Sequence, residues 1–231
     1  MSASAPARGV AVPAAVGVVV AAVVAVFAVV GLVVSFTSDR LPTGPALPPP
    51  AASEPVVTFD TTTRKARFDN VSVTMPASPY VCPTKPESLP GLMRSGVLCQ
   101  ADVHADYQGT SDWSATAGFG LVADELSRPD AEGTAKAFFQ EFRSQGFAKL
   151  ETTLSDYETQ RATLAGHEVV GVVGHVHYKV AGLPSTYDRV VVFAVPAEDG
   201  SFVIYFSSRP DDTPKSVLDP LNASINSLGI A

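Results

Sequence analysis

Basic charge is scarce in this sequence, and the cations that are present do not gather into a patch. The chain has 16 lysine and arginine residues against 23 aspartate and glutamate residues, and its net charge is −7. The longest basic group is the short one at Arg64, Lys65 and Arg67. A surface that follows a phosphate backbone needs a stripe of cations. The composition therefore argues against nucleic acid as a partner.

Motifs that carry catalysis or cofactor binding are also missing. The sequence contains no Gly-x-Ser-x-Gly and no glycine-rich phosphate loop. Ser111, Asp112 and His104 can be written as a serine–histidine–acid trio, but nothing in their spacing requires it. We therefore predict no catalytic residue and no cofactor. A hydrolase acting on cell-wall or lipid substrates is the alternative hypothesis.

Metal-binding patterns are weak. His175 and His177 alternate on a predicted strand, so both imidazoles would share one face and could meet one metal. A third ligand would have to come from His167 or His104, and the spacing requires neither. The sequence has two acid pairs, Asp124-Glu125 and Asp211-Asp212. Neither lies in a loop with ligands at alternating positions, as a calcium site requires, so we expect them to cap helices or to lie at the surface. We predict no metal site.

Cysteine is nearly absent, and its two copies, Cys82 and Cys99, are the only ones in the chain. An even pair outside the cytoplasm is typical of a disulfide. The enclosed loop is rich in proline. Closing a loop of this length is expected to stabilise the fold by about 3 kcal/mol, because the bridge lowers the entropy of the unfolded chain.

The most informative feature that is present is an uncharged run of valine, alanine and glycine at residues 9–36. A helix over residues 13–36 would be roughly 36 Å long at about 1.5 Å per residue, enough to cross a hydrocarbon core of about 30 Å. We predict an uncleaved transmembrane helix over residues 9–36. Arg8 weakly favours a cytoplasmic segment at residues 1–8. A proline-rich extracytoplasmic linker at residues 37–59 follows.

Residues 60–231 are expected to form one α+β domain outside the membrane. Alternating apolar residues predict strands over 68–75, 97–103 and 113–122. Asp130, Phe138, Phe139 and Gly146 mark the cap, the buried face and the end of a helix over 131–146.

After the first helix the apolar period switches to two. It predicts strands over 150–160, 168–178, 187–195 and 201–207, joined by short reversals that include the turn at Asp199-Gly200. Asp219 as cap and Pro220 at the first position predict a final helix ending at Gly229. The expected fold is an antiparallel sheet covered by helices, an α/β/α sandwich.

The segment over residues 76–96 has no strand or helix period and is closed at Cys82 and Cys99. Long ordered loops usually bind or cover something. We therefore expect it to contact a partner through the apolar side chains that it carries, which are Tyr80, Leu89, Leu92 and Met93.

The order of these elements resembles a known family. The carrying motifs are Ala165-Gly166 before a strand that ends at Tyr178, the sequence YDRVVV from Tyr187, and DGSFVIY from Asp199. They are similar to the PsbP-like, LpqN-type envelope proteins of actinobacteria, although a transmembrane helix stands where those have a lipidated cysteine. The resemblance implies a PsbP-like sandwich and a non-catalytic binding or accessory role at the cell membrane, with an envelope protein or an apolar envelope molecule as partner.

Overall fold

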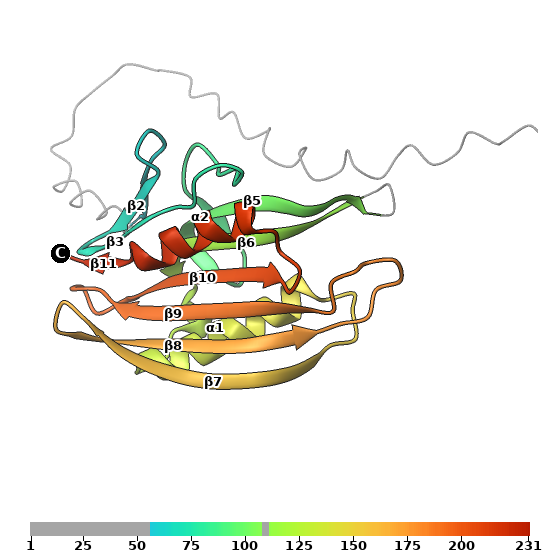
Figure 1. Cartoon of the computed structure of the whole chain (residues 1–231). Coiled ribbons are helices and arrows are strands. Elements are labelled where there is room, and N and C mark those ends of the chain that lie inside the picture. The colour runs from blue at the N-terminus through green and yellow to red at the C-terminus, as the bar shows by residue number, and fades with distance from the viewer. Residues whose placement is uncertain (1–55, 108–110) are drawn as a thin grey trace, which may run out of the picture. The chain divides into compact units, whose positions relative to one another are not determined.

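The computed structural model describes residues 56–107 and 111–231, and a seven-stranded sheet is the centre of their fold (Figure 1). The strand order is β4-β5-β6-β10-β9-β8-β7. All neighbouring strands are antiparallel, as the predicted hairpin turns require. The strands are β4 (Glu87–Leu89), β5 (Met93–Tyr107), β6 (Ser111–Val122), β7 (Thr153–Leu164), β8 (His167–His177), β9 (Tyr187–Pro196) and β10 (Phe202–Pro210).

The predicted cytoplasmic segment 1–8, the predicted membrane helix 9–36 and the linker up to residue 55 lie outside the described residues. Within residues 56–107 and 111–231, no helix is long and apolar enough to cross a membrane. The folded part begins slightly before the predicted boundary at residue 60. Val57 is only 3% exposed, and its N–H donates to the Ser95 hydroxyl at 3.1 Å.

One face of the sheet is covered by helix α1 (Ala131–Gly146), as the sequence predicts. The Asp130 carboxylate caps it by accepting a hydrogen bond from the Gly133 N–H at 2.6 Å. Phe138 and Phe139 are fully buried against the sheet. A short 3-10 helix, η1 (Asp124–Leu126), precedes α1. Because the apolar stripe, the cap and the terminal glycine all agree, this helix is the element that the sequence defines best.

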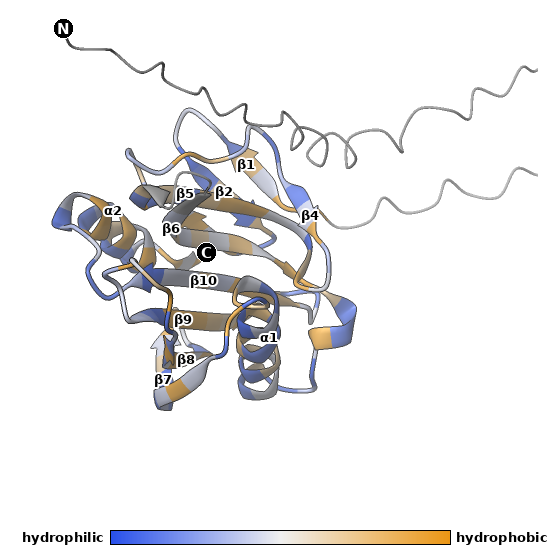
Figure 2. Cartoon of the chain, turned by 90° about the vertical axis from the view of Figure 1, so that its right-hand side faces the viewer, coloured by the Kyte–Doolittle hydropathy of each residue, from blue (hydrophilic) through white to orange (hydrophobic). Residues whose placement is uncertain are grey.

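The opposite face is covered by helix α2 (Lys215–Asn226) together with a second, small sheet (Figure 2). The two helices thus lie on opposite sides of the strands, which confirms the predicted arrangement of layers. The small sheet was not predicted. It has the order β1-β2-β3-β11, and its strands are β1 (Thr58–Asp60), β2 (Lys65–Phe68), β3 (Val71–Thr74) and β11 (Gly229–Ile230).

The start of α2 differs from the prediction. The helix begins at Lys215, after Pro214, and Pro220 lies inside it rather than at its first position. The buried stripe already starts at Val217, which is 2% exposed and lies one turn before Leu221. Burial of this extra turn outweighs the cost of an interior proline, about 3 kcal/mol, because the last turns of the helix are anchored on the core by the same stripe.

Two strand predictions also need correction. The predicted strand over 68–75 is split, because Asp69 adopts a left-handed conformation (φ 52°) and turns the chain between β2 and β3. The predicted loop over 76–96 is a loop only in part, since it contains β4 and the start of β5. The strand β4 was missed because it is only three residues long and has a proline on each side. It lies at the edge of the sheet, where proline is tolerated.

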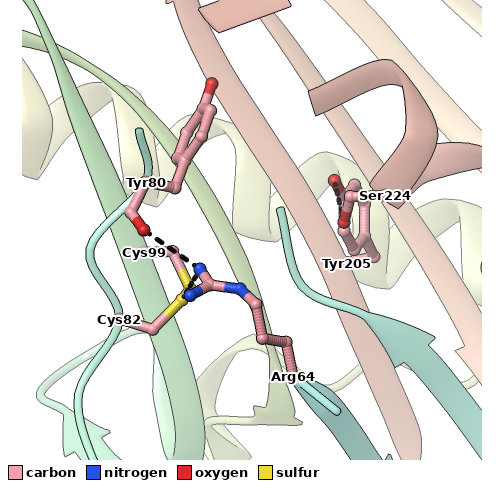
Figure 3. The surroundings of a disulfide bond; sticks show 6 residues. All are labelled: Arg64, Tyr80, Cys82, Cys99, Tyr205 and Ser224. Carbon is pink, nitrogen blue, oxygen red and sulfur yellow. Dashed lines mark hydrogen bonds between the residues drawn. A yellow bond between two sulfur atoms is a disulfide. The ribbon is translucent and has the colours of Figure 1, made fainter. Parts of the chain in front are cut away.

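The predicted disulfide between Cys82 and Cys99 is present (Figure 3). It ties the loop before β4 to β5, next to a two-way backbone pairing of Val81 with Gln100 at 2.8 and 2.9 Å. Arg64 adds to this junction, since its Nη2 donates to the Tyr80 carbonyl at 3.1 Å and to the Cys82 Sγ at 2.8 Å. The disulfide itself therefore lies on the side of the sheet that faces the small sheet, whereas Leu89 and Leu92 of the segment that it closes lie on the α1 side.

Candidate functional site

A pocket of about 410 Å³ lies on the α1 face of the sheet, between the C-terminal end of α1 and strands β4, β5 and β6. We call it the α1 pocket. Its size falls within the range of roughly 300–1,000 Å³ that small-molecule sites occupy. Its apolar walls are formed by Leu89, Leu92, Leu98, Phe142, Phe147 and Phe206.

The floor of the α1 pocket is polar. Gln100 of β5 lies opposite Thr116 of β6, and Thr116 lies opposite Ser208 of β10, so three polar residues cross three neighbouring strands in one row. The Thr116 hydroxyl oxygen is buried and has no hydrogen-bond partner among the described residues. Buried polar atoms are normally paired. The row thus offers an unused polar group to whatever occupies the pocket.

Asp188 of β9 lies diagonally across from Ser208, whose direct register partner in β9 is Val190, and it is only 4% exposed. Its Oδ1 accepts a hydrogen bond from the Tyr178 hydroxyl at 2.7 Å and a long one from the Trp113 indole N–H at 3.4 Å. Its Oδ2 accepts from the Ser208 hydroxyl at 2.7 Å. All three donors are neutral, so the carboxyl group is hydrogen-bonded but its charge is not compensated.

Burial raises the pKa of Asp188 above its usual value of 3.8, and the hydrogen bonds from Ser208, Tyr178 and Trp113 oppose this shift. Burial likewise raises the pKa of Tyr178, and the neighbouring Asp188 raises it further. Tyr178 therefore stays a neutral donor over the physiological range.

Aromatic rings support the carboxyl group. The ring centroids of Trp113 and Tyr178 are 4.8 Å apart, and the Phe147 ring stacks on Tyr178 at 5.9 Å. Phe142 contacts Phe206 at 4.9 Å. These contacts fix the positions of the pocket walls, because each ring is held by another ring as well as by the sheet.

The rim between α1 and the sheet is closed by Gln145. Its Nε2 donates to the Pro90 carbonyl at 3.3 Å and to the Glu141 carboxylate at 2.8 Å. Pro90 and Gly91 form the turn between β4 and β5, and Gly91 has a positive φ of 74°. A Cβ at position 91 would lie 2.6 Å from the Gln145 Nε2, so glycine is required here for the turn and the side chain to meet.

The four side chains expected to contact a partner are divided between the core and the pocket. Tyr80 and Met93 are 3% and 1% exposed, so they are core residues and the prediction that they form a binding surface is wrong. They were misplaced because their segment pairs with the sheet and does not stand away from it. Leu92 is buried and Leu89 is half-buried, and both line the α1 pocket. Partner contact through these two stays a prediction.

The sequence reasoning missed Asp188, which lies inside the motif that begins at Tyr187. A signal existed. In a strand, alternate residues share a face, and Asp188 shares its face with Val190 and Val192, which are fully buried. An acid in register with a buried apolar face has to be either paired or functional.

The histidines do not converge on the α1 pocket. His175 and His177 do share a face of β8, but it is the opposite face, where their rings flank Tyr187 at 4.5 and 5.2 Å. The His175 Nδ1 contacts the Asp156 carboxylate at 2.8 Å, and the His177 Nε2 contacts the Ser155 hydroxyl at 2.7 Å. In the part of the chain that the structure describes, no group of three or more metal-ligating side chains is placed to hold an ion.

His104 does not belong to the trio considered from the sequence. Its Nε2 contacts both the Ser185 hydroxyl and the Asp212 carboxylate, each at 2.9 Å. Both partners therefore use the same ring nitrogen, whereas a proton relay needs the acid on one nitrogen and the nucleophile on the other. The side chains of Ser111 and Asp112 lie outside the described residues.

The other acid pairs have local partners. Asp211 accepts hydrogen bonds from the Thr186 N–H and hydroxyl at 2.9 and 2.8 Å, and Asp124 forms an ion pair with Arg94 at 3.2 Å. Asp211 and Thr186 lie just outside strands β10 and β9, Arg94 lies near the start of β5, and Asp124 is the first residue of η1. Structural roles account for both acids.

Comparison with solved structures finds distant structural relatives of this chain. No protein-family model matches the chain, and no curated protein matches it. The solution structure of cyanobacterial PsbP (CyanoP) from Synechocystis sp. PCC 6803 is similar, with a TM-score of 0.43 and 12% identity, covering 81% of this chain and 100% of that chain. A likeness at this level transfers no ligand, partner or activity.

Proposed function

We propose that this chain is a non-catalytic binding protein of the cell envelope, anchored by residues 9–36, whose extracytoplasmic domain binds an apolar molecule in the α1 pocket. The observation that carries the proposal is the pocket itself, an apolar cavity with a short polar row and one carboxyl group at its base. Sites for small molecules usually combine apolar walls with a few convergent polar groups in this way.

The composition of the lining favours binding over catalysis. The described residues that line the α1 pocket include no histidine, the side chain that most often acts as a general base, and the Ser208 hydroxyl donates to Asp188 without a histidine between them. Asp188 is hydrogen-bonded through both oxygens, which suits it to positioning a ligand. We also propose that the chain is an LpqN-type envelope protein of actinobacteria and that its ligand is an apolar molecule of the envelope.

The anchor is supported by the uncharged run at residues 9–36 and by the disulfide, which forms in oxidising compartments. We expect that protease added to intact spheroplasts degrades or releases residues 56–231. An epitope tag placed before residue 9 should stay protected until the membrane is opened. A mature N-terminus beyond residue 36, read by sequencing of the purified protein, would overturn the anchor.

Binding is tested with N-phenyl-1-naphthylamine, a neutral apolar dye that fluoresces in dry sites. The full-length protein should bind it, and energy transfer from Trp113, which lines the pocket and is the only tryptophan in the chain, should report it. We expect Leu89→Asp to weaken dye binding at least about ten-fold, because a half-buried wall residue becomes charged.

The matched control is Val81→Asp. Val81 lies directly before Cys82, but it is 76% exposed and does not line the pocket. Its variant should bind the dye like the wild type. Equal loss in the two variants, or no transfer from Trp113, would place apolar binding elsewhere and contradict the proposal.

A further inference from the structure

The α1 pocket carries one sign of charge. Asp188 is the single charged residue among the described residues that line it. None of the ion pairs in the described part of the chain includes Asp188. A buried carboxylate without a cation is costly, and such groups are normally paired. The missing partner is therefore a positive charge.

The hydrogen bonding of Asp188 leaves room for that charge. A carboxylate offers about four acceptor positions on its two oxygens. Oδ1 accepts from Tyr178 and Trp113, whereas Oδ2 accepts only from Ser208. Oδ2 thus keeps an acceptor position. The unpaired hydroxyl oxygen of Thr116 lies on the same row, directly opposite Ser208 in the strand register.

The surroundings of the pocket are also negative. Ser114 at the rim donates to the Asp102 carboxylate at 3.1 Å, and Asp211 is close enough to Asp188 to raise its pKa by repulsion. The C-terminal end of α1, at Gly146, lines the pocket as well. Helix C-termini carry partial negative charge and favour cations. The negative charge around the pocket and the carboxylate at its base both favour a cationic ligand.

The walls suit a cation with an apolar body. Trp113 and Phe147 line the pocket together with the leucines. A protonated amine placed at Asp188 would therefore meet a carboxylate, while its hydrocarbon part lies among apolar and aromatic side chains.

We propose that the α1 pocket binds a protonated amine with an apolar body, with the ammonium at Asp188 Oδ2 and the hydrocarbon against Leu89, Leu92 and Leu98. This inference rests on the proposed function, because it assigns a chemical class to the ligand of the same pocket. The ammonium supplies three donors, which matches a site that has acceptors left over at Asp188 and Thr116.

The site should respond to pH through Asp188. Burial raises the pKa of this carboxyl group, so lowering the pH converts it to the neutral form at a higher pH than for an exposed aspartate. The amine needs the ionised form, so its affinity should fall as the pH is lowered toward 4, whereas that of a neutral analogue should not. The titratable groups on the elements packed around Asp188 are Tyr178 of β8, His104 and Asp102 of β5, and Asp211 and Asp212 after β10.

The test uses three ligands that differ only in the head group: 4-phenylbutylamine, 4-phenylbutanol and 4-phenylbutyrate. Each is titrated into the full-length protein in phosphatidylcholine vesicles, and quenching of Trp113 reports occupancy of the pocket. We expect the amine to bind at least about ten-fold more tightly than the alcohol, as a charge-assisted hydrogen bond would give, and the acid to bind most weakly. Asp188→Asn should bring the amine to the affinity of the alcohol.

The control is Asp102→Asn, which removes an exposed acid at the rim and should keep the preference for the amine. Equal binding of amine and alcohol to the wild type, or a preference that survives Asp188→Asn, overturns the amine assignment while apolar binding stands. Quenching by none of the three ligands contradicts the proposed function itself. If Asp188→Asn does not fold, the pH series on the wild type decides: a preference for the amine that is unchanged between pH 7 and pH 4 overturns the assignment.

Discussion

Met93→Asp is expected to unfold the extracytoplasmic domain, whereas Leu89→Asp is expected to leave it folded. The Met93 side chain is 1% exposed and lies against two glycines, Gly96 and Gly120, so that a Cβ at position 96 would come within 2.9 Å of its methyl group. An aspartate here would be a buried charge without a partner, at a cost of roughly 3–5 kcal/mol or more. Domains are stable by only about 5–15 kcal/mol.

The measurement is urea unfolding followed by circular dichroism, with Met93→Leu as the control. Leucine keeps the volume and should cost less than about 1.5 kcal/mol. Leu89 is half-buried on the edge strand β4, so an aspartate there can turn toward solvent. A folded Met93→Asp variant with a midpoint close to that of the wild type would show that this part of β5 is looser than its burial indicates.

This contrast shows where the sequence was informative. The strands β7 to β10 were predictable because each is a run rich in strand-forming residues, and because short turns join β7 to β8 and β9 to β10. The Asp199-Gly200 reversal is present, with Gly200 at a φ of 83° and a hydrogen bond from its N–H to the Ala197 carbonyl at 3.1 Å. Local chemistry specifies local pairing, so these hairpins need no distant information.

The small sheet could not be predicted for the opposite reason. Its last strand, β11, has two residues, and it pairs with β3 through Gly229 opposite Ser72 and Ile230 opposite Val71. These partners lie at opposite ends of the domain sequence. No turn signal links them, and a strand this short has no readable period. Such pairing is decided by the packing of α2, which brings the C-terminus back over the first strands (Figure 1).

The α1 pocket was only partly predictable. The sequence pointed to Leu89 and Leu92, because an irregular, proline-rich segment is a common place for binding residues. It did not point to the base of the pocket, where Asp188, Thr116 and Ser208 come from three strands. Each of these residues is ordinary in its own strand. Only the register of the sheet places them side by side.

Phe206→Ala is expected to cost about 3–5 kcal/mol of stability, the range for truncating a fully buried phenylalanine. Phe206 has no exposed surface, and its ring contacts Phe138 at 5.1 Å and Phe142 at 4.9 Å. It also covers Gly118 of β6. Because Phe206 lines the α1 pocket, its removal should enlarge the cavity without adding charge, so the dye should still bind to the folded fraction.

Phe193→Ala is the matched control for this prediction. Phe193 lies on the opposite face of the sheet and likewise covers a strand glycine, Gly171, but it is only half-buried. Phe193→Ala should lower the free energy of unfolding, measured in urea, clearly less than Phe206→Ala does. It should leave dye binding unchanged. Equal losses in the two variants would mean that contact with a glycine, rather than burial next to the pocket, sets the contribution of each ring.

The pairing of Phe206 with Gly118 gives a second, internal check. A Cβ at position 118 would overlap the Phe206 ring, so Gly118→Ala should destabilise the wild type. In the Phe206→Ala background the ring is gone, and the same substitution should be neutral or stabilising, because alanine loses less backbone entropy than glycine on folding. The double-mutant cycle thus predicts coupling between the two sites. Additive effects would show that the ring does not rest on Gly118 and that this wall of the α1 pocket is arranged differently.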